Sequence, residues 1–518
     1  MSRTSRFAGG VSLGYLNQIL ATIIGLWITP FLFQRIGQNN YGLWLVGAQI
    51  LLYMTLMDFG IVALLPREIG FITGRAQGWR SEELPALSGQ TLRLLLAQVP
   101  LLACAGVALW FAMPQGWAPL RNPLGMVMIA FTALFPLRIF PAILQGLQDL
   151  VFVGSVQVVA AMLYPLLAAA LVYAGWGLGA LALAWTAGQV LVTVLCWLRI
   201  RRVYPGVLPS RLPRFDRQSS WSLLKRGFWV TVSQVAQVLL NGTDMVIIAR
   251  VFGPAAVVPY AFTGKLITVL ANQPQLLMQS AGPALSEMRA GESTQRQLQA
   301  CNALSQATML ASGAVACVVM LVNRGFVSWW TGPAQYGGFL LCTLLLVNML
   351  LRHWNNPLVY AVFCFGGERR LALTTFFDGL VTFSGTLLLV RFIGLAGAPL
   401  AAIAGACLIS LPGNLGKLSS ETGERPWDLM IPLKPWAVRF VPLALAAAAI
   451  QNYWTPNNPF ALAAAVAGAG VVYAAVMLPA ALRDPLGIYL RPALAAGIQK
   501  IRGAFAQQPE PCVTEQQP

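Results

Sequence analysis

The chain has 518 residues, of which 57% are hydrophobic and only 10% are charged. A soluble domain usually carries about 25% charged residues, so this composition excludes an ordinary soluble protein and indicates one that lies mostly in lipid. The formal net charge is +17, but the basic residues lie mainly in loops between apolar runs, where anionic lipid explains them without nucleic acid.

Apolar runs recur along the chain and repeatedly reach about 20 residues, the length that a helix needs to cross a hydrocarbon core. These runs do not alternate with period two, so they predict helices and not the strands of a membrane β-barrel. We therefore expect an all-α polytopic membrane protein with about 14 transmembrane helices. The predicted spans are residues 8–33, 41–65, 94–113, 123–145, 151–173, 178–198, 227–252, 257–284, 303–322, 338–363, 371–391, 395–413, 435–451 and 459–482.

A basic segment at residues 199–226 sets the predicted orientation. It holds six arginines before Ser219, then Lys225 and Arg226, against a single acid, Asp216. Short loops rich in Lys and Arg remain on the cytoplasmic side of a membrane. With this segment in the cytoplasm, most other basic residues also fall in cytoplasmic loops, and both termini are predicted to be cytoplasmic.

Two predicted six-span halves correspond at an offset of about 215 residues, as in transporters built from internal repeats. The segment RIG at 35–37 matches RVFG at 250–253, and Arg138 in the fourth span matches Arg352 in the tenth. Chance matching of such short pairs is the alternative. The predicted organisation is an N-terminal six-helix lobe (1–198), the basic linker (199–226), a C-terminal six-helix lobe (227–416), two additional helices (417–482), and an amphipathic segment with a disordered tail (483–518).

Ionisable side chains inside spans usually face a bundle interior or a water-filled cavity. Three of them, Arg138, Arg352 and Lys265, are candidates for a cationic, substrate-binding cavity. For the two arginines the alternative is a structural ion pair, and Lys265 could instead snorkel to the membrane surface.

Three acids and one histidine also lie inside predicted spans. For Asp58, Asp244 and Asp378 we favour helix-pinning ion pairs over ligand binding. The nearby cations are Arg67 for Asp58, Arg250 for Asp244, and Arg369 and Arg370 for Asp378. His353, the single histidine, could couple transport to protons, although a lone helical histidine is more often a satisfied polar contact.

The sequence contains no catalytic motif. It lacks the phosphate-binding pattern GxxxxGK and the zinc pattern HExxH, and one histidine excludes a multi-histidine metal site. The longest predicted loop is too short for a soluble catalytic domain. We therefore expect a protein that is not an enzyme and has neither cofactor nor metal.

Four stretches resemble the polysaccharide transporter family: TPFLFQRIGQNNYGLW, LMDFGIVALLPREIG, NGTDMVIIARVFGPAAVVPYAF and FCFGGERRLAL. This family comprises the O-antigen flippases, relatives of lipid II flippases and of multidrug and toxic compound extrusion transporters. The resemblance implies a protein of the bacterial inner membrane that exports an undecaprenyl-pyrophosphate-linked oligosaccharide by alternating access. Its expected partners are that lipid-linked oligosaccharide, membrane lipids and, as a further candidate, the polysaccharide polymerisation machinery.

Three other functions compete with this interpretation. A drug or cation antiporter of the related extrusion group should have a cavity dominated by acids, whereas the deepest matched residues here are arginines. A membrane-embedded O-antigen polymerase or ligase should have a large outer loop, whereas all the outer loops between the predicted spans are short. A purely structural membrane protein would leave the arginines inside the spans unexplained.

Overall fold

The computed structural model describes residues 20, 22–76, 78–213, 217–291, 294–364 and 368–492, and for residues 217, 219–220, 275–291, 294, 364 and 368 the backbone alone. Several predicted features lie outside these ranges: the start of the first span, the end of the amphipathic segment, and the C-terminal tail.

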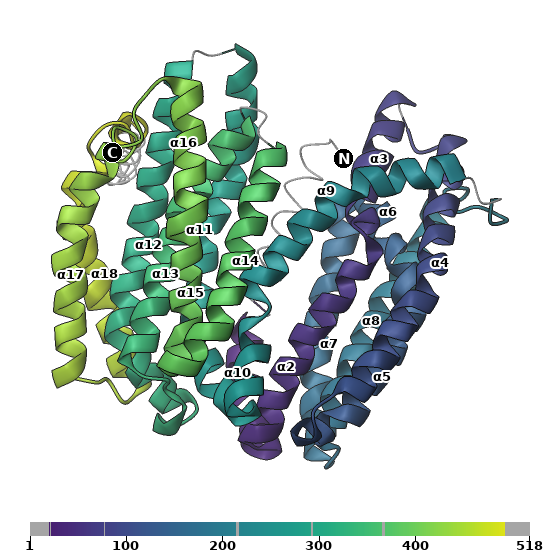
Figure 1. Ribbon diagram of the computed structural model, residues 1–518, viewed down its shortest axis with the longest axis horizontal. Helices are drawn as coiled ribbons and strands as arrows, with labels where there is room; N and C mark the ends of the chain where they lie inside the picture. The colour runs from purple at the N-terminus through teal and green to yellow at the C-terminus, as the bar shows by residue number, and fades with distance from the viewer. Residues whose placement is uncertain are drawn as a thin grey trace, which may run out of the picture. The chain divides into compact units, whose positions relative to one another are not determined.

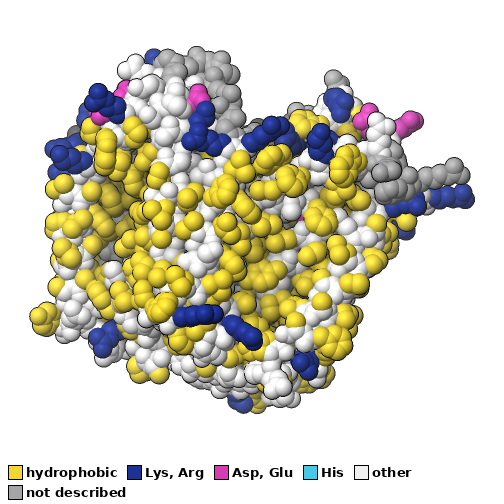
Figure 2. Space-filling view, viewed as in Figure 1, with side chains coloured by type: hydrophobic (Ala, Val, Ile, Leu, Met, Phe, Trp, Pro, Cys, Tyr) yellow, Lys and Arg dark blue, Asp and Glu magenta, His cyan; other side chains and the backbone are white. Residues whose placement is uncertain are grey.

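The described part of the chain is built from helices, without strands (Figure 1). By length and apolar composition, nine of these helices could cross a membrane, or up to eleven if each of two bent pairs is one span. Figure 2 shows hydrophobic side chains covering the flanks of the helices, with Lys and Arg mostly toward the helix ends. The prediction of an all-α polytopic membrane protein is confirmed, whereas the count of fourteen spans is not.

Several helices extend well beyond the spans predicted for them. The helix α4 (Glu83–Ala112) begins eleven residues before its predicted span, and α12 (Thr294–Trp330) is longer at both ends. Hydropathy marks only the segment that matches the lipid core, while a helix can continue into polar sequence.

The other single helices are α5 (Ala118–Leu134), α6 (Ile139–Gly146), α7 (Leu150–Tyr173), α8 (Gly177–Val203), α11 (Val257–Gly291), α13 (Phe339–Cys364), α14 (Glu368–Ile393), α15 (Gly397–Gly405), α16 (Leu411–Thr422), α17 (Lys434–Tyr453) and α18 (Pro459–Ala481).

Two predicted spans, 41–65 and 227–252, are bent where the sequence analysis expected continuous helices. The first consists of α2 (Gln38–Thr55), a 3₁₀ turn η1 (Leu56–Asp58) and α3 (Ile61–Arg75), with a bend of 50°. The second consists of α9 (Arg217–Asn241) and α10 (Asp244–Phe252), with a bend of 42°. We call these breaks hinge 1 and hinge 2.

The backbone conformation of Phe59 and Gly60 accounts for hinge 1. Phe59 and Gly60 both adopt left-handed backbone conformations, with φ of 48° and 70°. Because a left-handed residue cannot continue a right-handed helix, the chain must change direction here. Hydropathy does not detect this break, since the residues around it are apolar.

The described helices form two compact units. Unit 1 comprises Met1–Lys265, Val327–Leu345 and Ala372–Ser410. Within it α7 packs along α8, α8 along α5, and α3 against α6. Its core contains large side chains that are almost completely buried, including Leu43, Ile69, Leu95, Leu124, Phe135 and Ile143.

Unit 2 comprises Leu266–Phe326, Leu346–Leu371 and Leu411–Pro518. An apolar cluster from α12, α13 and α16 forms part of its core. In α17, Trp436 stacks on Phe440 and donates to the Tyr473 hydroxyl of α18 at 3.2 Å. Tyr473 in turn donates to the Leu310 carbonyl at 2.8 Å, which ties the last two helices to α12.

Candidate functional site

Hinge 1 carries a buried ion pair. The side chain of Asp58 is only 2% exposed, and its Oδ1 accepts a hydrogen bond from the Gly60 amide at 2.9 Å. Its Oδ2 lies 3.4 Å from Nη1 of Arg138. The expected ion pair at Asp58 is therefore present, but with Arg138 and not with Arg67. The partner lies 80 residues away in sequence, so sequence spacing gave no guide to it.

The position of Arg138 follows from a local break in the helical chain. It ends the 3₁₀ turn η3 (Phe135–Arg138), which separates α5 from α6 and contains Pro136. Its guanidinium lies over the rings of Phe131 and Phe135, at 5.7 and 5.8 Å from their centroids. The side chain remains 30% exposed. Since a guanidinium has five N–H donors, one carboxylate does not exhaust its capacity for anions.

Hinge 2 also carries an aspartate, but one held by a neutral partner. Asp244 begins α10, where its Oδ1 accepts from the Met245 amide at 2.9 Å and its Oδ2 from the Tyr260 hydroxyl at 2.5 Å. The expected ion pair with Arg250 is absent from the described structure. Residues six apart point about 240° away from each other around a helix, so Asp244 and Arg250 face different sides.

Hinge 1 contacts α9 through glycines. A Cβ added at Gly60 would lie 2.7 Å from the Gly227 carbonyl oxygen, and one at Gly227 would lie 2.4 Å from the Phe59 carbonyl oxygen. Only glycine permits such close backbone approach between membrane helices. At hinge 2 the contact is polar, because the Tyr53 hydroxyl of α2 donates to the Gly242 carbonyl. Each bent span is therefore held at its break by the other.

The two turns matched in the predicted repeat meet at one end of unit 1. Gly37 and Gly253 have nearly the same backbone conformation, with φ of 85° and 88°. Gln38, after the first turn, donates to the Ala255 carbonyl at 3.0 Å and accepts from the Gln335 amide at 3.1 Å. These contacts hold the two turns together at this end of the unit. Neither Gln38 nor Gln335 was predicted from the sequence as a contact residue, although Gln38 directly follows the matched Gly37.

Asp378 of α14 is completely buried within unit 1. Its Oδ2 accepts from Ser410 and its Oδ1 from Thr382, the latter at 3.3 Å. Ser410 ends a π-helical turn, Ala406–Ser410, which interrupts the helical chain after α15. Such turns are frequent at functional sites. The sequence analysis placed Asp378 correctly inside a span but did not identify these hydroxyl partners.

The remaining predicted residues are divided between the units. Lys265, half-buried, ends one segment of unit 1, whereas Arg352 and His353 lie in the α13 part of unit 2. His353 is buried, and its Nδ1 lies 2.7 Å from the Ser312 hydroxyl. This contact agrees with the alternative given for a lone helical histidine, a satisfied polar contact. A cavity shared by Arg138, Arg352 and Lys265 stays a prediction.

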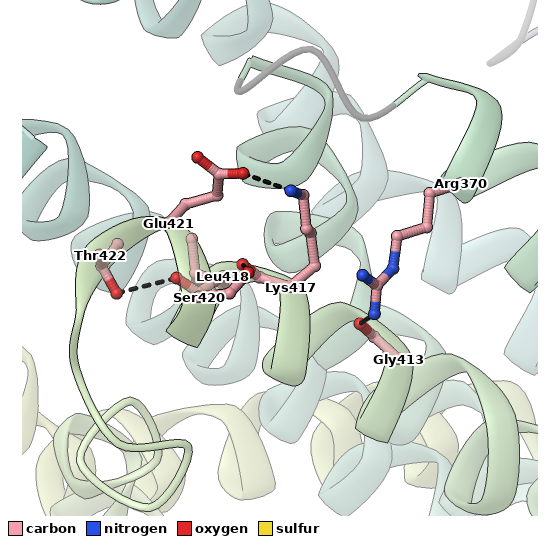
Figure 3. A network of polar contacts seen from close by, with 7 residues as sticks. All are labelled: Arg370, Gly413, Lys417, Leu418, Ser420, Glu421 and Thr422. Atoms are coloured by element: carbon pink, nitrogen blue, oxygen red, sulfur yellow. Dashed lines mark hydrogen bonds and ion pairs between the residues drawn. The ribbon is translucent and has the colours of Figure 1, made fainter.

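Polar contacts also gather near α16 in unit 2 (Figure 3). Arg370, one of the cations expected near Asp378, donates to the Gly413 carbonyl at 3.4 Å. Lys417 pairs with Glu421 one helical turn later, and Thr422 donates to the Leu418 carbonyl at 2.8 Å. The Arg370 bond lies near the start of α16 and the other two contacts lie near its end, so this network has a structural explanation.

Comparison with known proteins supports the same class of molecule. A family model described as polysaccharide biosynthesis protein matches residues 142–332. No curated protein matches in sequence. The fold is similar to that of a lipid II flippase, MurJ, in an inward closed conformation, with a TM-score of 0.66 and 9% identity over 92% of this chain and 99% of that chain.

Multidrug transporters share the fold less closely. An inward-facing MATE transporter of the MOP superfamily has a TM-score of 0.53 and 14% identity over 81% of this chain and 99% of its own. A Vibrio cholerae MATE transporter has a TM-score of 0.52 and 13% identity over 82% of this chain and 99% of its own. The predicted resemblance is thereby confirmed: the chain is a multi-pass membrane protein with the fold of lipid II flippase and MATE transporters, and residues 142–332 match a family of polysaccharide biosynthesis proteins.

Proposed function

We propose that the chain is a flippase that moves an undecaprenyl-pyrophosphate-linked oligosaccharide across the bacterial inner membrane by alternating access. The observation that carries the proposal is the fold of a lipid II flippase over 92% of the chain, together with the polysaccharide biosynthesis match at residues 142–332. The chemistry of hinge 1 supports the anionic character of the proposed cargo.

Arg138 is the residue of unit 1 best suited to the pyrophosphate. Its planar guanidinium can hold phosphate oxygens with two parallel hydrogen bonds, which a lysine cannot do. When no cargo is bound, Asp58 balances the charge, and so avoids the large penalty of an isolated charge inside a membrane protein. A pyrophosphate that reaches the exposed edge of Arg138 would share or replace this carboxylate.

The two hinges suit alternating access. Bends of 50° and 42° already interrupt the helices that meet at Gln38 and Ala255, so a change in either bend could separate these residues. Opening this end would break the Gln38–Ala255 and Gln38–Gln335 hydrogen bonds and would separate α2 from the turn at Pro254, on which it packs closely. The polyprenyl tail would remain in lipid while the headgroup crosses.

A drug or cation antiporter is the second candidate, because the MATE fold also matches and the helices of unit 1 contain the aspartates Asp58, Asp244 and Asp378. Under this alternative Asp58, Asp244 or Asp378 would bind the cargo, and Arg138 would only neutralise Asp58. The two candidates therefore differ in what Arg138 does.

Measuring polysaccharide export by living cells distinguishes the flippase from the antiporter. Cells lacking this gene should accumulate lipid-linked oligosaccharide, and wild-type protein should restore surface polysaccharide. Arg138→Lys keeps a charge for Asp58 but loses the guanidinium fork, so it should accumulate normally and export poorly. Arg391→Lys, an exposed arginine in the last turn of α14, is the matched control and should export normally. Normal export by Arg138→Lys would contradict a substrate role for Arg138, and drug sensitivity without a glycan defect would favour the antiporter.

A further inference from the structure

A cavity of ≈ 620 Å³ lies within unit 1, between α2, α4 and α10. It includes residues from both bent spans, such as Tyr53 of α2 and Val246 of α10. On α4 it is lined by Ala105, Ala108 and Ala112. These three positions recur at helical spacing, and their small side chains leave room between α4 and its neighbours.

The chemistry of the lining is almost entirely apolar. Of its two notable polar side chains, Tyr53 is already engaged, because its hydroxyl donates to the Gly242 carbonyl. The other is Arg250, which is exposed and makes no hydrogen bond or ion pair within the described residues. The cavity thus offers apolar walls and a single free cation.

The corresponding turn of the first half does not leave its arginine free. Arg35 lies over the rings of Phe31 and Tyr173, at 6.0 and 5.5 Å from their centroids. Stacking on aromatic faces stabilises a guanidinium without a counter-ion. Arg250 has no such ring contact in the described structure. An anion is therefore the chemically complementary group at Arg250 alone.

We propose that this cavity binds one anionic phospholipid, with its phosphate on Arg250 and an acyl chain along the alanines of α4. Arg250 lies three residues before Gly253, where the helix ends, so the cation is at headgroup depth. Tyr53 lies fifteen residues into α2, roughly 22 Å along the helix, so the apolar wall continues deep into the lipid core. The cation and the apolar surface are separated in the way that an amphiphile requires.

The occupant is a lipid of the surrounding membrane and not the transported one. The lining of the cavity includes none of the three residues predicted to bind cargo, Arg138, Arg352 and Lys265. A phospholipid, in contrast, is always present at the flank of a membrane protein and needs no open gate. The proposal is independent of which cargo the protein carries.

Binding can be measured by native mass spectrometry of the purified full chain with phosphatidylglycerol, and with phosphatidylcholine of the same acyl chains. The wild type should retain one phosphatidylglycerol in preference to phosphatidylcholine. Arg250→Gln should reduce that preference by about tenfold, as expected for the loss of one charge-assisted contact. Arg391→Gln, which removes an exposed arginine elsewhere, should leave it unchanged.

A second pair of variants tests the cavity itself. Ala108→Trp should fill the space and abolish retention of either lipid, whereas Val107→Trp, at an exposed neighbouring position outside the cavity, should not. Equal retention by Ala108→Trp and wild type, or an unchanged preference in Arg250→Gln, would overturn the proposal. So would displacement of phosphatidylglycerol by an equal amount of undecaprenyl phosphate, which would assign the cavity to the transported lipid.

Discussion

Hinge 1 and hinge 2 both place an aspartate at a break in a membrane helix, but they stabilise its carboxylate by different means. Asp58 is paired with a cation, Arg138, across 3.4 Å. Asp244 is held by the Tyr260 hydroxyl and a backbone amide. Removing one partner of an ion pair leaves the other as an isolated buried charge, which is strongly destabilising. Removing the Tyr260 hydroxyl takes away one hydrogen bond from Asp244, whose other oxygen still accepts from the Met245 amide.

The packing around hinge 1 is also less tolerant of change than the packing around hinge 2. Hinge 1 rests on backbone contact between Gly60 and Gly227, which leaves no room for a side chain. Hinge 2 rests on the Tyr53 hydroxyl, which can rotate. Hinge 1 should therefore be the stiffer and more sensitive element, and hinge 2 the more tolerant one.

The largest expected effect comes from breaking the ion pair. Arg138→Ala leaves Asp58 buried and unpaired, and should lower stability by about 3–5 kcal/mol. Asp244→Ala, which leaves two hydrogen-bond donors unsatisfied, should lower it by about 1–3 kcal/mol. The thermal midpoint of each detergent-purified variant is the measurement.

A double variant serves as the control for this comparison. Adding Asp58→Asn to Arg138→Ala removes the isolated charge and should recover much of the lost midpoint. A midpoint that stays as low as that of the single variant would mean that the two residues do not act as a pair.

An intermediate effect is expected from the glycines. Gly227→Ala forces a Cβ against the Phe59 carbonyl and should cost about 1–3 kcal/mol, because neither backbone can yield without moving a helix. At Gly242 an added Cβ would lie 3.0 Å from the Val238 carbonyl and 3.2 Å from the Leu52 side chain, so Gly242→Ala should have the smaller effect on thermal midpoint. Equal thermal midpoints of Gly227→Ala and Gly242→Ala would contradict the proposed difference in stiffness between the two hinges.

The smallest effects should come from the hydroxyls of hinge 2. Tyr260→Phe deprives the Asp244 carboxylate of a donor, and Tyr53→Phe deprives only the neutral Gly242 carbonyl. Bonds to charged groups are worth about 1.5–3 kcal/mol and neutral ones about 0.5–1.5 kcal/mol, so Tyr260→Phe should lower the midpoint more. The reverse order would show that Asp244 does not depend on Tyr260.

Sequence reasoning located the membrane helices because their apolar stretches reflect the solvent around them. It did not locate the hinges, since the apolar residues beside Phe59 and Gly60 conceal a change of backbone conformation. The match between Gly37 and Gly253 was visible because both have positive φ with extended ψ, of 155° and 162°, a backbone conformation that is essentially restricted to glycine.

The charged residues of the candidate site were found for a similar reason, but their partners were not. A charge inside an apolar run is conspicuous, so Asp58, Arg138 and Asp244 could all be selected from the sequence. Which cation meets which acid depends on contacts such as α3 with α6, and local spacing wrongly suggested Arg67 and Arg250. The tyrosine and serine partners gave no signal, because uncharged hydroxyl side chains are not conspicuous within an apolar run.

The central claim is that the chain moves a polyprenyl-pyrophosphate oligosaccharide, and proteoliposomes test it most directly. The purified protein is reconstituted with the labelled lipid-linked glycan in the inner leaflet, and a membrane-impermeant lectin reports glycan that reaches the outside. Wild-type protein should expose the glycan much faster than empty liposomes, and Arg138→Lys should be slower at equal reconstitution. Exposure by the wild type no faster than by empty liposomes would contradict the proposed function.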